Sequence, residues 1–139
     1  MNETLPLPDD WTRLVQAARE VRTRAYARYS GYSVGAALRT DDGQIFTGCN
    51  VENASLGLTI CAERAAMCSA VTSGAVRPEV ICVSVCGHSV PCGSCRQFLT
   101  EFNPRLSVLL DDCSSADPPE CLRLNDLFPR AFGLHHDVP

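Results

Sequence analysis

The sequence lacks any hydrophobic run long enough to cross a membrane, since no apolar stretch approaches the ~18 residues that a spanning helix needs. It also lacks a surplus of positive charge. Twelve lysines and arginines stand against 16 aspartates and glutamates, which leaves a formal net charge of −4. Proteins that bind the phosphates of nucleic acids need a basic surface. We therefore expect a protein with no membrane span and no nucleic-acid partner.

The N-terminus has neither the basic nor the apolar segment of a secretory signal. We therefore expect a cytoplasmic protein whose nine cysteines are kept reduced. Close cysteine spacings then indicate metal or redox chemistry rather than a disulfide framework. Isolated cysteines usually behave as small buried hydrophobic residues. We assign that role to six of the nine: Cys49, Cys68, Cys82, Cys86, Cys113 and Cys121.

What is present fits one globular domain. The chain has 139 residues, of which 45% are hydrophobic and 20% charged. Single domains commonly run from ~100 to ~150 residues, and this composition is ordinary for them. We expect a single domain over residues 1–139, with tails at residues 1–8 and 134–139.

The hydrophobic pattern predicts an α/β protein. Apolar residues at helical spacing predict helices over residues 11–25, 60–73 and 91–102. Runs rich in β-formers predict strands over residues 33–40, 44–51, 80–85, 107–110 and 122–124. This order implies helices packed on a mixed sheet. The last two strands should be antiparallel, because about ten residues separate them and a parallel crossover needs a dozen or more.

A Cys-x-x-Cys motif lies just after the predicted central strand, at the start of the next helix. It comprises Cys92 and Cys95, within Pro-Cys-Gly-Ser-Cys-Arg. Taken alone, it fits a metal site, a thioredoxin-like redox pair or an inert core equally well.

A second motif, Cys61-Ala62-Glu63-Arg64, adds a third thiol at the start of another predicted helix. Helical side chains lean toward the helix N-terminus, so thiols in two first turns can converge on one point. Three thiolates around Zn²⁺ leave the fourth tetrahedral position for water, as in catalytic zinc sites. Cys86 or His88 as a fourth ligand would close the site and make it structural.

Two further side chains fit a catalytic zinc site. Glu63 need not be a ligand, and it would take the proton that a water at the metal loses. Arg64 lies three residues after Cys61. It would donate a hydrogen bond to a ligand sulfur and offset the negative charge of three thiolates.

Four ordered motifs resemble those of the small, homotetrameric cytidine deaminases. They are Val34-Gly35-Ala36-Ala37-Leu38, Gly48-Cys49-Asn50-Val51-Glu52-Asn53-Ala54, Cys61-Ala62-Glu63-Arg64 and Pro91-Cys92-Gly93-Ser94-Cys95-Arg96-Gln97. The likeness runs from about Tyr26 to Gly133. It implies a three-layer α/β/α fold with a mixed five-stranded sheet, one Zn²⁺ per subunit, and a homotetramer whose subunits share active sites.

The resemblance also implies a reaction and the residues that bind its substrate. Cytidine and 2′-deoxycytidine would be hydrolysed to uridine and 2′-deoxyuridine with release of ammonia, in pyrimidine salvage. An activated water would attack C4, while Glu63 carries its proton to N3 and then to the departing amine. Asn50 and Glu52 would bind the ribose hydroxyls. Three further residues complete the implied site: Ala54 near the base through its backbone, Tyr32 stacked on the ring, and Phe132 reaching into a neighbouring subunit's site.

Other functions remain open at this point. Within deamination, the substrate could be a free pyrimidine base or an aminoacyl-nucleoside antibiotic. In other classes, Cys92 and Cys95 could serve a thiol–disulfide redox protein, or the three thiols could belong to a non-enzymatic zinc module. One tightly held zinc with turnover of cytidine separates the deaminase from both.

Overall fold

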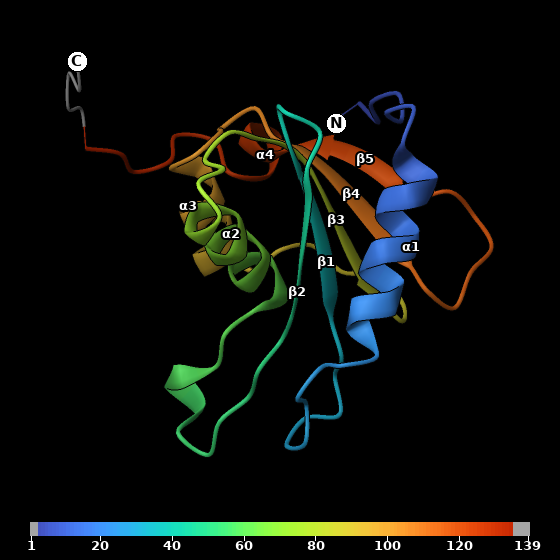
Figure 1. Ribbon diagram of the computed structural model, residues 1–139, viewed down its shortest axis with the longest axis vertical. Helices are drawn as coiled ribbons and strands as arrows, with labels where there is room; N and C mark the ends of the chain where they lie inside the picture. Colours follow the sequence, from blue (N-terminus) through green and yellow to red (C-terminus); the bar gives the residue numbers. More distant parts are fainter. Residues whose placement is uncertain (1–2, 135–139) are drawn as a thin grey trace.

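The computed structural model describes residues 3–134 and has three layers. A central five-stranded sheet carries helix α1 on one face and helices α2 and α3 on the other (Figure 1). In chain order the elements are α1 Trp11–Arg22, β1 Gly35–Thr40, β2 Ile45–Cys49, η1 Leu56–Leu58, α2 Ala62–Thr72, β3 Pro78–Val85, α3 Gly93–Thr100, β4 Ser107–Asp112, β5 Glu120–Arg123 and α4 Leu124–Leu127. The predicted α/β/α fold and order of elements are confirmed.

The sheet is mixed, with strand order β2-β1-β3-β4-β5. Strand β1 pairs antiparallel with β2 and β3, β3 pairs parallel with β4, and β4 pairs antiparallel with β5. Helix α3 lies in the crossover between the two parallel strands, where a helix is expected. The prediction that the last two strands are antiparallel is confirmed.

Strand β3 has a continuous apolar sequence because both of its faces are covered. Alternate residues point to opposite sides: Ile81 and Val83 pack under α2 and α3, whereas Val80 and Cys82 pack under α1. Cys82 is fully buried, as predicted. The sheet therefore separates two hydrophobic cores, and the core under α2 and α3 supports the elements that carry the three thiols.

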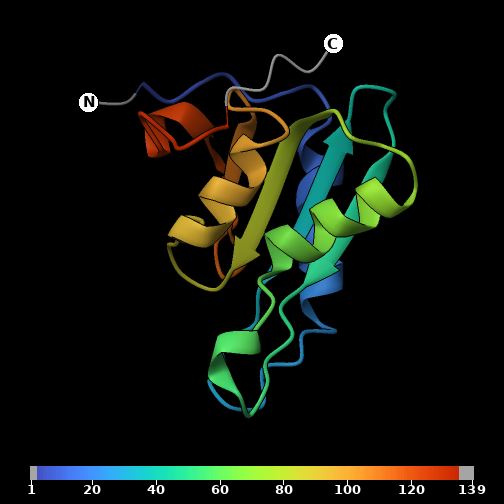
Figure 2. The same cartoon turned by 90° about the vertical axis from the view of Figure 1, so that its left-hand side faces the viewer.

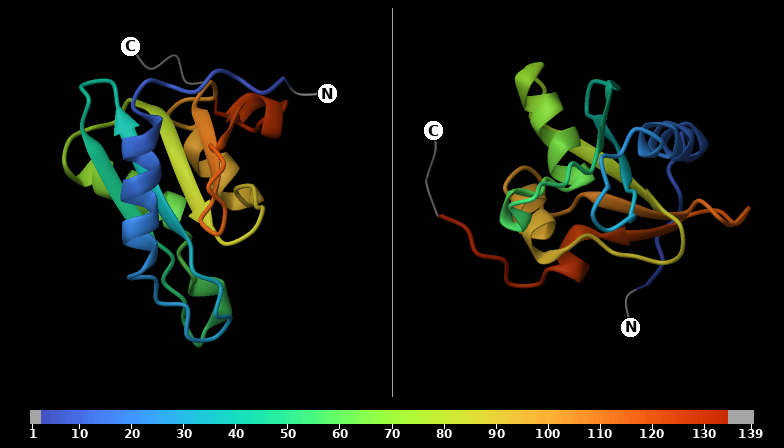
Figure 3. Two further views of the ribbon diagram at one scale, coloured as in Figure 1. Left: turned by 90° about the vertical axis from the view of Figure 1, so that its right-hand side faces the viewer. Right: turned by 90° about the horizontal axis from the view of Figure 1, so that it is seen from below.

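The N-terminal segment, expected to be a tail, lies against the sheet across one end of the fold (Figure 3). The amide of Leu5 donates to the carbonyl oxygen of Cys121 on the edge strand β5, at 2.8 Å. Leu5 and Leu7 pack against the core under α1. This contact was not predicted because Pro6 and Pro8 are typical of a tail, although the adjacent Leu5 and Leu7 pack into the core. Apart from Leu134, the expected C-terminal tail lies outside the described residues.

Helix α2 sits unusually close to the sheet. A Cβ at Gly48 on β2 would lie 2.4 Å from the backbone nitrogen of Ala66 and 2.6 Å from the carbonyl oxygen of Ala62. Glycine at this position therefore permits the first turns of α2 to contact β2 directly. Helices α2 and α3 lie over the same face of the sheet (Figure 2). Within residues 3–134, no helix is long and apolar enough to cross a membrane.

Candidate active site

Three cysteines from two helix starts come together beside the end of β3. Cys61 immediately precedes α2, Cys92 immediately precedes α3, and Cys95 lies in the first turn of α3. Cys61 and Cys92 have extended backbones, so each side chain projects beyond its helix N-terminus. Their sulfur atoms and that of Cys95 all lie within 4.8 Å of one another. The predicted convergence of these three thiols is confirmed.

The spacing of the sulfurs fits tetrahedral zinc. Zn–S bonds of about 2.3 Å hold two sulfur ligands about 3.8 Å apart. The sulfurs of Cys61 and Cys92 are 3.9 Å apart. Among the residues that the structure describes, no fourth His, Cys or carboxylate joins the cluster. The arrangement matches a three-ligand zinc site with one position left for water.

The surroundings of Cys61 favour its thiolate form. A hydrogen bond with the Cys95 thiol, supported by the Arg64 guanidinium, lowers the pKa of Cys61 to about 5. The same hydrogen bond, together with burial, raises the pKa of Cys95. Nη2 of Arg64 donates to the Cys61 sulfur at 3.5 Å and to the carbonyl oxygen of Thr59 at 3.2 Å. The contact expected for Arg64 is therefore present, and it anchors the positive charge beside the sulfurs.

Glu63 is the buried carboxyl of the site. Only 5% of the residue is exposed, and its Oε2 accepts a hydrogen bond from the Cys95 thiol at 3.6 Å. Burial raises the pKa of Glu63, and the negative charge of Cys61 raises it further. A carboxyl with a raised pKa can both hold and release a proton near neutral pH.

A cavity of about 230 Å³ opens beside this cluster. Cys61, Glu63 and Cys92 are among its polar lining residues, and four valines contribute apolar lining: Val34, Val83, Val85 and Val90. Mostly apolar walls with a few convergent polar groups are typical of small-molecule sites. The motifs in the sequence do not indicate a role for these valines at the site. The alternation of side chains along β3 could have indicated Val83 and Val85, because they lie on the face that α2 and α3 cover.

Asn50 lines the cavity, but its amide already has protein partners. Its Oδ1 accepts from the amide of Val34 at 2.9 Å, and its Nδ2 donates to the carbonyl oxygen of Tyr32 at 2.7 Å. The residue is nearly buried. Asn50 therefore holds residues 32–34, which lead into β1, beside the cavity, a positioning role that was not predicted from the sequence. Its expected contact with ribose stays a prediction.

Glu52 also lines the cavity and holds the neighbouring loop. Its carboxylate accepts hydrogen bonds from the amides of Tyr29 and Ser30 at 2.9 and 3.0 Å, and from the Ser30 hydroxyl. These bonds, chiefly the one from the Ser30 hydroxyl, lower the pKa of Glu52. The side chain therefore stays ionised at neutral pH, which suits an acceptor of hydroxyl groups. Its expected contact with ribose stays a prediction.

The remaining predicted residues differ in their placement. Tyr32 lines the cavity and is about half exposed. Ala54 and Phe132 do not line it. Phe132 is 69% exposed, and its backbone carbonyl accepts from Nε2 of Gln97 at 3.0 Å. Within one chain the structure does not bring Phe132 to the cavity, so its expected role requires a neighbouring subunit and stays a prediction.

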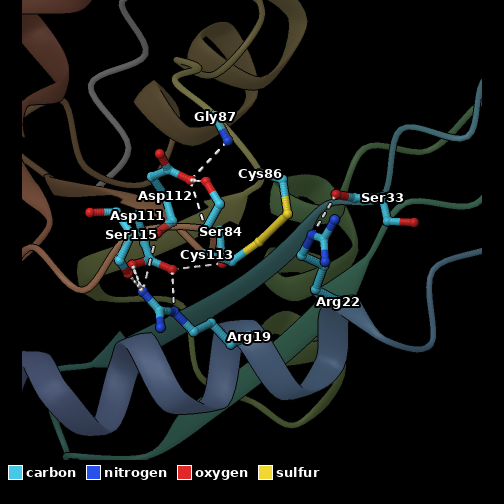
Figure 4. Close-up of a disulfide and its surroundings, with 11 residues drawn as sticks. Arg19, Arg22, Ser33, Ser84, Cys86, Gly87, Asp111, Asp112, Cys113 and Ser115 are labelled. Atoms are coloured by element: carbon cyan, nitrogen blue, oxygen red, sulfur yellow. Dashed lines mark hydrogen bonds and ion pairs between the residues drawn. A yellow bond between two sulfur atoms is a disulfide. The ribbon is translucent and has the colours of Figure 1, made fainter.

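Two cysteines predicted to be reduced packing residues are paired. Cys86 and Cys113 form a disulfide between the ends of β3 and β4 (Figure 4). The parallel register sets Val85 opposite Asp112, so the next residue of each strand is a cysteine. Cys86 is thus not a zinc ligand, and His88 is not in the thiol cluster. Cys68, also expected to be buried, is exposed on α2.

Comparison with known proteins also indicates a zinc site in this chain. Residues 9–110 match the family model for the cytidine and deoxycytidylate deaminase zinc-binding region. The chain is 46% identical to the cytidine deaminase of Mycobacterium tuberculosis strain H37Rv over 138 residues, which is 96% of this chain and 97% of that protein. It is 38% identical to the cytidine deaminase of Halalkalibacterium halodurans over 127 residues, covering 88% of this chain and 94% of that one.

Solved structures agree with the fold. The crystal structure of cytidine deaminase from Burkholderia pseudomallei superposes with a TM-score of 0.82 at 44% identity, covering 87% of this chain and 98% of that chain. The Mycobacterium tuberculosis enzyme superposes with a TM-score of 0.77 at 41% identity, covering 91% of this chain and 100% of that chain.

Proposed function

Because the chain belongs to the cytidine deaminase family, we propose that it hydrolyses cytidine and 2′-deoxycytidine to uridine and 2′-deoxyuridine, with release of ammonia. One observation carries this proposal: three thiols spaced for zinc adjoin a buried carboxyl that lines a cavity of about 230 Å³. A redox pair would need only Cys92 and Cys95 and would leave Cys61, the third thiol of the cluster, without a role. A closed structural zinc site would need a fourth ligand.

Cys61, Cys92 and Cys95 would hold the metal as thiolates. When bound, zinc supplies an activated water as the nucleophile for C4 of the pyrimidine. Arg64 offsets the charge of the thiolates through its hydrogen bond to the Cys61 sulfur. Placing Cys61, Cys92 and Cys95 at helix N-termini adds a favourable interaction between each thiolate and a helix dipole.

Glu63 moves the protons of the reaction. Its carboxylate takes the proton that the attacking water loses and delivers it to N3 of the ring. A second proton, from the hydroxyl group added at C4, then passes through Glu63 to the amine; the C4–N bond breaks, ammonia leaves and the C4 carbonyl forms. Burial supports this role, because a raised pKa lets the carboxyl accept a proton from water and return it to nitrogen.

The cavity favours a neutral substrate. Its charged lining residues are Glu52 and Glu63, and no cationic side chain is found among the described residues that line it. The ionised Glu52 carboxylate opposes the approach of a 5′-phosphate or a nucleic-acid backbone. The valine walls would enclose the pyrimidine ring, and Asn50 and Glu52 would meet the sugar at the outer end.

We further propose a cytoplasmic homotetramer that serves pyrimidine salvage. Several large apolar side chains are exposed in the single chain, including Leu56 at 74% and Phe132 at 69%. Exposed apolar surface of this kind can be covered by a protein interface. A neighbouring subunit that covers this surface could bring its own Phe132 to the cavity.

The test is the loss of ultraviolet absorbance when zinc-loaded protein is mixed with cytidine. We expect turnover by the wild type and a loss of about 10²- to 10⁴-fold in Glu63→Gln, with zinc content unchanged. Glu79→Gln, on the exposed part of β3, is the matched control and should keep full activity. Full activity in Glu63→Gln would refute the mechanism. Absence of turnover by the wild type would refute the function.

A further inference from the structure

The disulfide between Cys86 and Cys113 lies at the start of a chain segment that lines the cavity. Cys86 directly follows β3, and Cys113 directly follows β4, with a Cα–Cα distance of 5.0 Å. Residues 87–90 then lead from Cys86 toward the zinc motif. Within this segment, Ser89 and Val90 line the cavity. The disulfide is therefore joined to the substrate site by a few residues of chain.

The two ends of the segment are held differently. At its far end, Pro91 is buried, and its carbonyl oxygen accepts from Nε of Arg96 at 2.7 Å. At its near end, the amide of Gly87 donates to Oδ1 of Asp112 at 2.9 Å (Figure 4). Residues 87 and 88 are exposed. Two links thus restrain the near end of the segment: the disulfide from Cys86 to the end of β4, and one exposed hydrogen bond.

The strands themselves do not depend on this link. Asp111, buried on β4, accepts two hydrogen bonds from Arg19 of α1 at 2.7 and 2.8 Å, and one from the Ser84 hydroxyl on β3 at 2.7 Å. The amide of Cys113 also donates to the carbonyl oxygen of Val85 at 2.8 Å. Opening the disulfide would therefore loosen the segment after Cys86 and leave the sheet intact.

We propose that Cys86 and Cys113 form a reversible thiol–disulfide switch that sets the position of residues 87–90 and so the affinity for the nucleoside. This inference rests on the proposed function. The closed form holds Ser89 and Val90 against the cavity, and the open form binds substrate less tightly. Cys86 is exposed, and exposed disulfides are the labile ones in reducing surroundings.

The oxidant would be a small disulfide of the glutathione type. The Cys86 thiolate attacks one sulfur of that disulfide, which releases one small thiol and leaves a mixed disulfide. Cys113 then loses its proton and attacks the Cys86 sulfur, so the second small thiol leaves. The two protein thiols are oxidised by two electrons, and one disulfide is reduced to two thiols. Excess small thiol reverses both steps.

The test uses zinc-loaded enzyme equilibrated in mixtures of reduced and oxidised glutathione. Alkylation followed by mass spectrometry reports the state of each cysteine, and zinc content is measured in parallel. For the wild type we expect the Cys86–Cys113 pair to close as the mixture becomes oxidising. KM for cytidine should then fall about fivefold, with little change in kcat or zinc.

Variants assign the effect to this pair. Cys86→Ser and Cys113→Ser should keep the higher KM in every mixture. Cys68→Ser, which removes an exposed cysteine on α2, should respond like the wild type. Failure of the pair to close, an unchanged KM when it closes, or a KM response that persists in Cys86→Ser would overturn the switch.

Binding of the product uridine, measured by calorimetry, separates this proposal from the proposed function. A redox-dependent uridine affinity without any cytidine turnover would refute the function and leave the switch standing. Turnover with a redox-independent KM would refute the switch alone.

Discussion

Gly48→Ala would create a steric clash with α2, the helix whose start carries Cys61 and Glu63. Its Cβ would lie 2.4 Å from the backbone nitrogen of Ala66, against an ordinary contact of at least 3.4 Å. A backbone atom cannot rotate away as a side chain can. Helix α2 would therefore have to move away from β2 by roughly 1 Å, because atoms closer than van der Waals contact repel each other strongly.

That movement of α2 would displace some of the site residues relative to the others. Cys61 and Glu63 belong to the start of α2, whereas Cys92 and Cys95 stay with α3. Metal sites need ligand distances within about 0.2 Å of their ideal values. A 1 Å misplacement of reacting groups can cost about 10²-fold in rate. Overpacking itself costs about 1–3 kcal/mol of the free energy of unfolding.

Gly35→Ala is the matched control, because it makes the same kind of clash on the opposite face of the sheet. Its Cβ would lie 2.0 Å from the carbonyl oxygen of Ala18 on α1, away from the thiols. Urea unfolding should show both variants destabilised. Zinc retention against a chelator and kcat/KM for cytidine, measured well below both unfolding midpoints, should fall far more in Gly48→Ala.

Two results would refute this reasoning. One is wild-type zinc retention and turnover in Gly48→Ala, which would mean that α2 does not need its present position on β2. The other is equal loss of zinc in Gly35→Ala, which would mean that general destabilisation rather than displacement of α2 empties the site.

Two further predictions concern the charges of the site. Arg64→Ala removes the donor to the Cys61 sulfur, so we expect weaker zinc retention in chelator competition and lower turnover; unchanged zinc retention and kinetics would contradict the role of Arg64. In metal-free protein, burial raises the pKa of Glu63 above its unfolded value of about 4.5, so the unfolded chain loses this proton first and the free energy of unfolding falls as pH rises. Glu63→Gln should therefore gain stability over the wild type as pH rises above about 4.5 in urea unfolding, and a constant difference would contradict it.

Much of the fold could be predicted because local sequence carries it. The apolar run of β3 requires cover on both faces, and the structure provides α1 on one side and α2 with α3 on the other. The short connection before β5 excludes a parallel return. The N-terminal segment was predicted wrongly, because the pairing of Leu5 with β5 joins residues far apart in the chain.

The metal ligands could be predicted for a similar reason. Cys61, Cys92 and Cys95 occupy helix starts, and side-chain direction at a helix start follows from helix geometry. The partners of Asn50 and Glu52 could not be predicted, since they lie in the loop at residues 29–34 and depend on how that loop folds back. The valine walls likewise depend on which face of β3 turns toward the site.

By itself, the sequence determined which residues form the three-thiol site with its carboxyl and arginine, because residues 61–64 and residues 92–95 each lie within one helix turn. The packing of α2 and α3 on the same face of the sheet then brings these two motifs together. Only the tertiary structure decided that Cys86 meets Cys113. Their contact requires the parallel register of β3 and β4 across a separation of 27 residues. The nine cysteines thus divide into three metal ligands, one disulfide and four others, a division that hydrophobic pattern and spacing alone cannot specify.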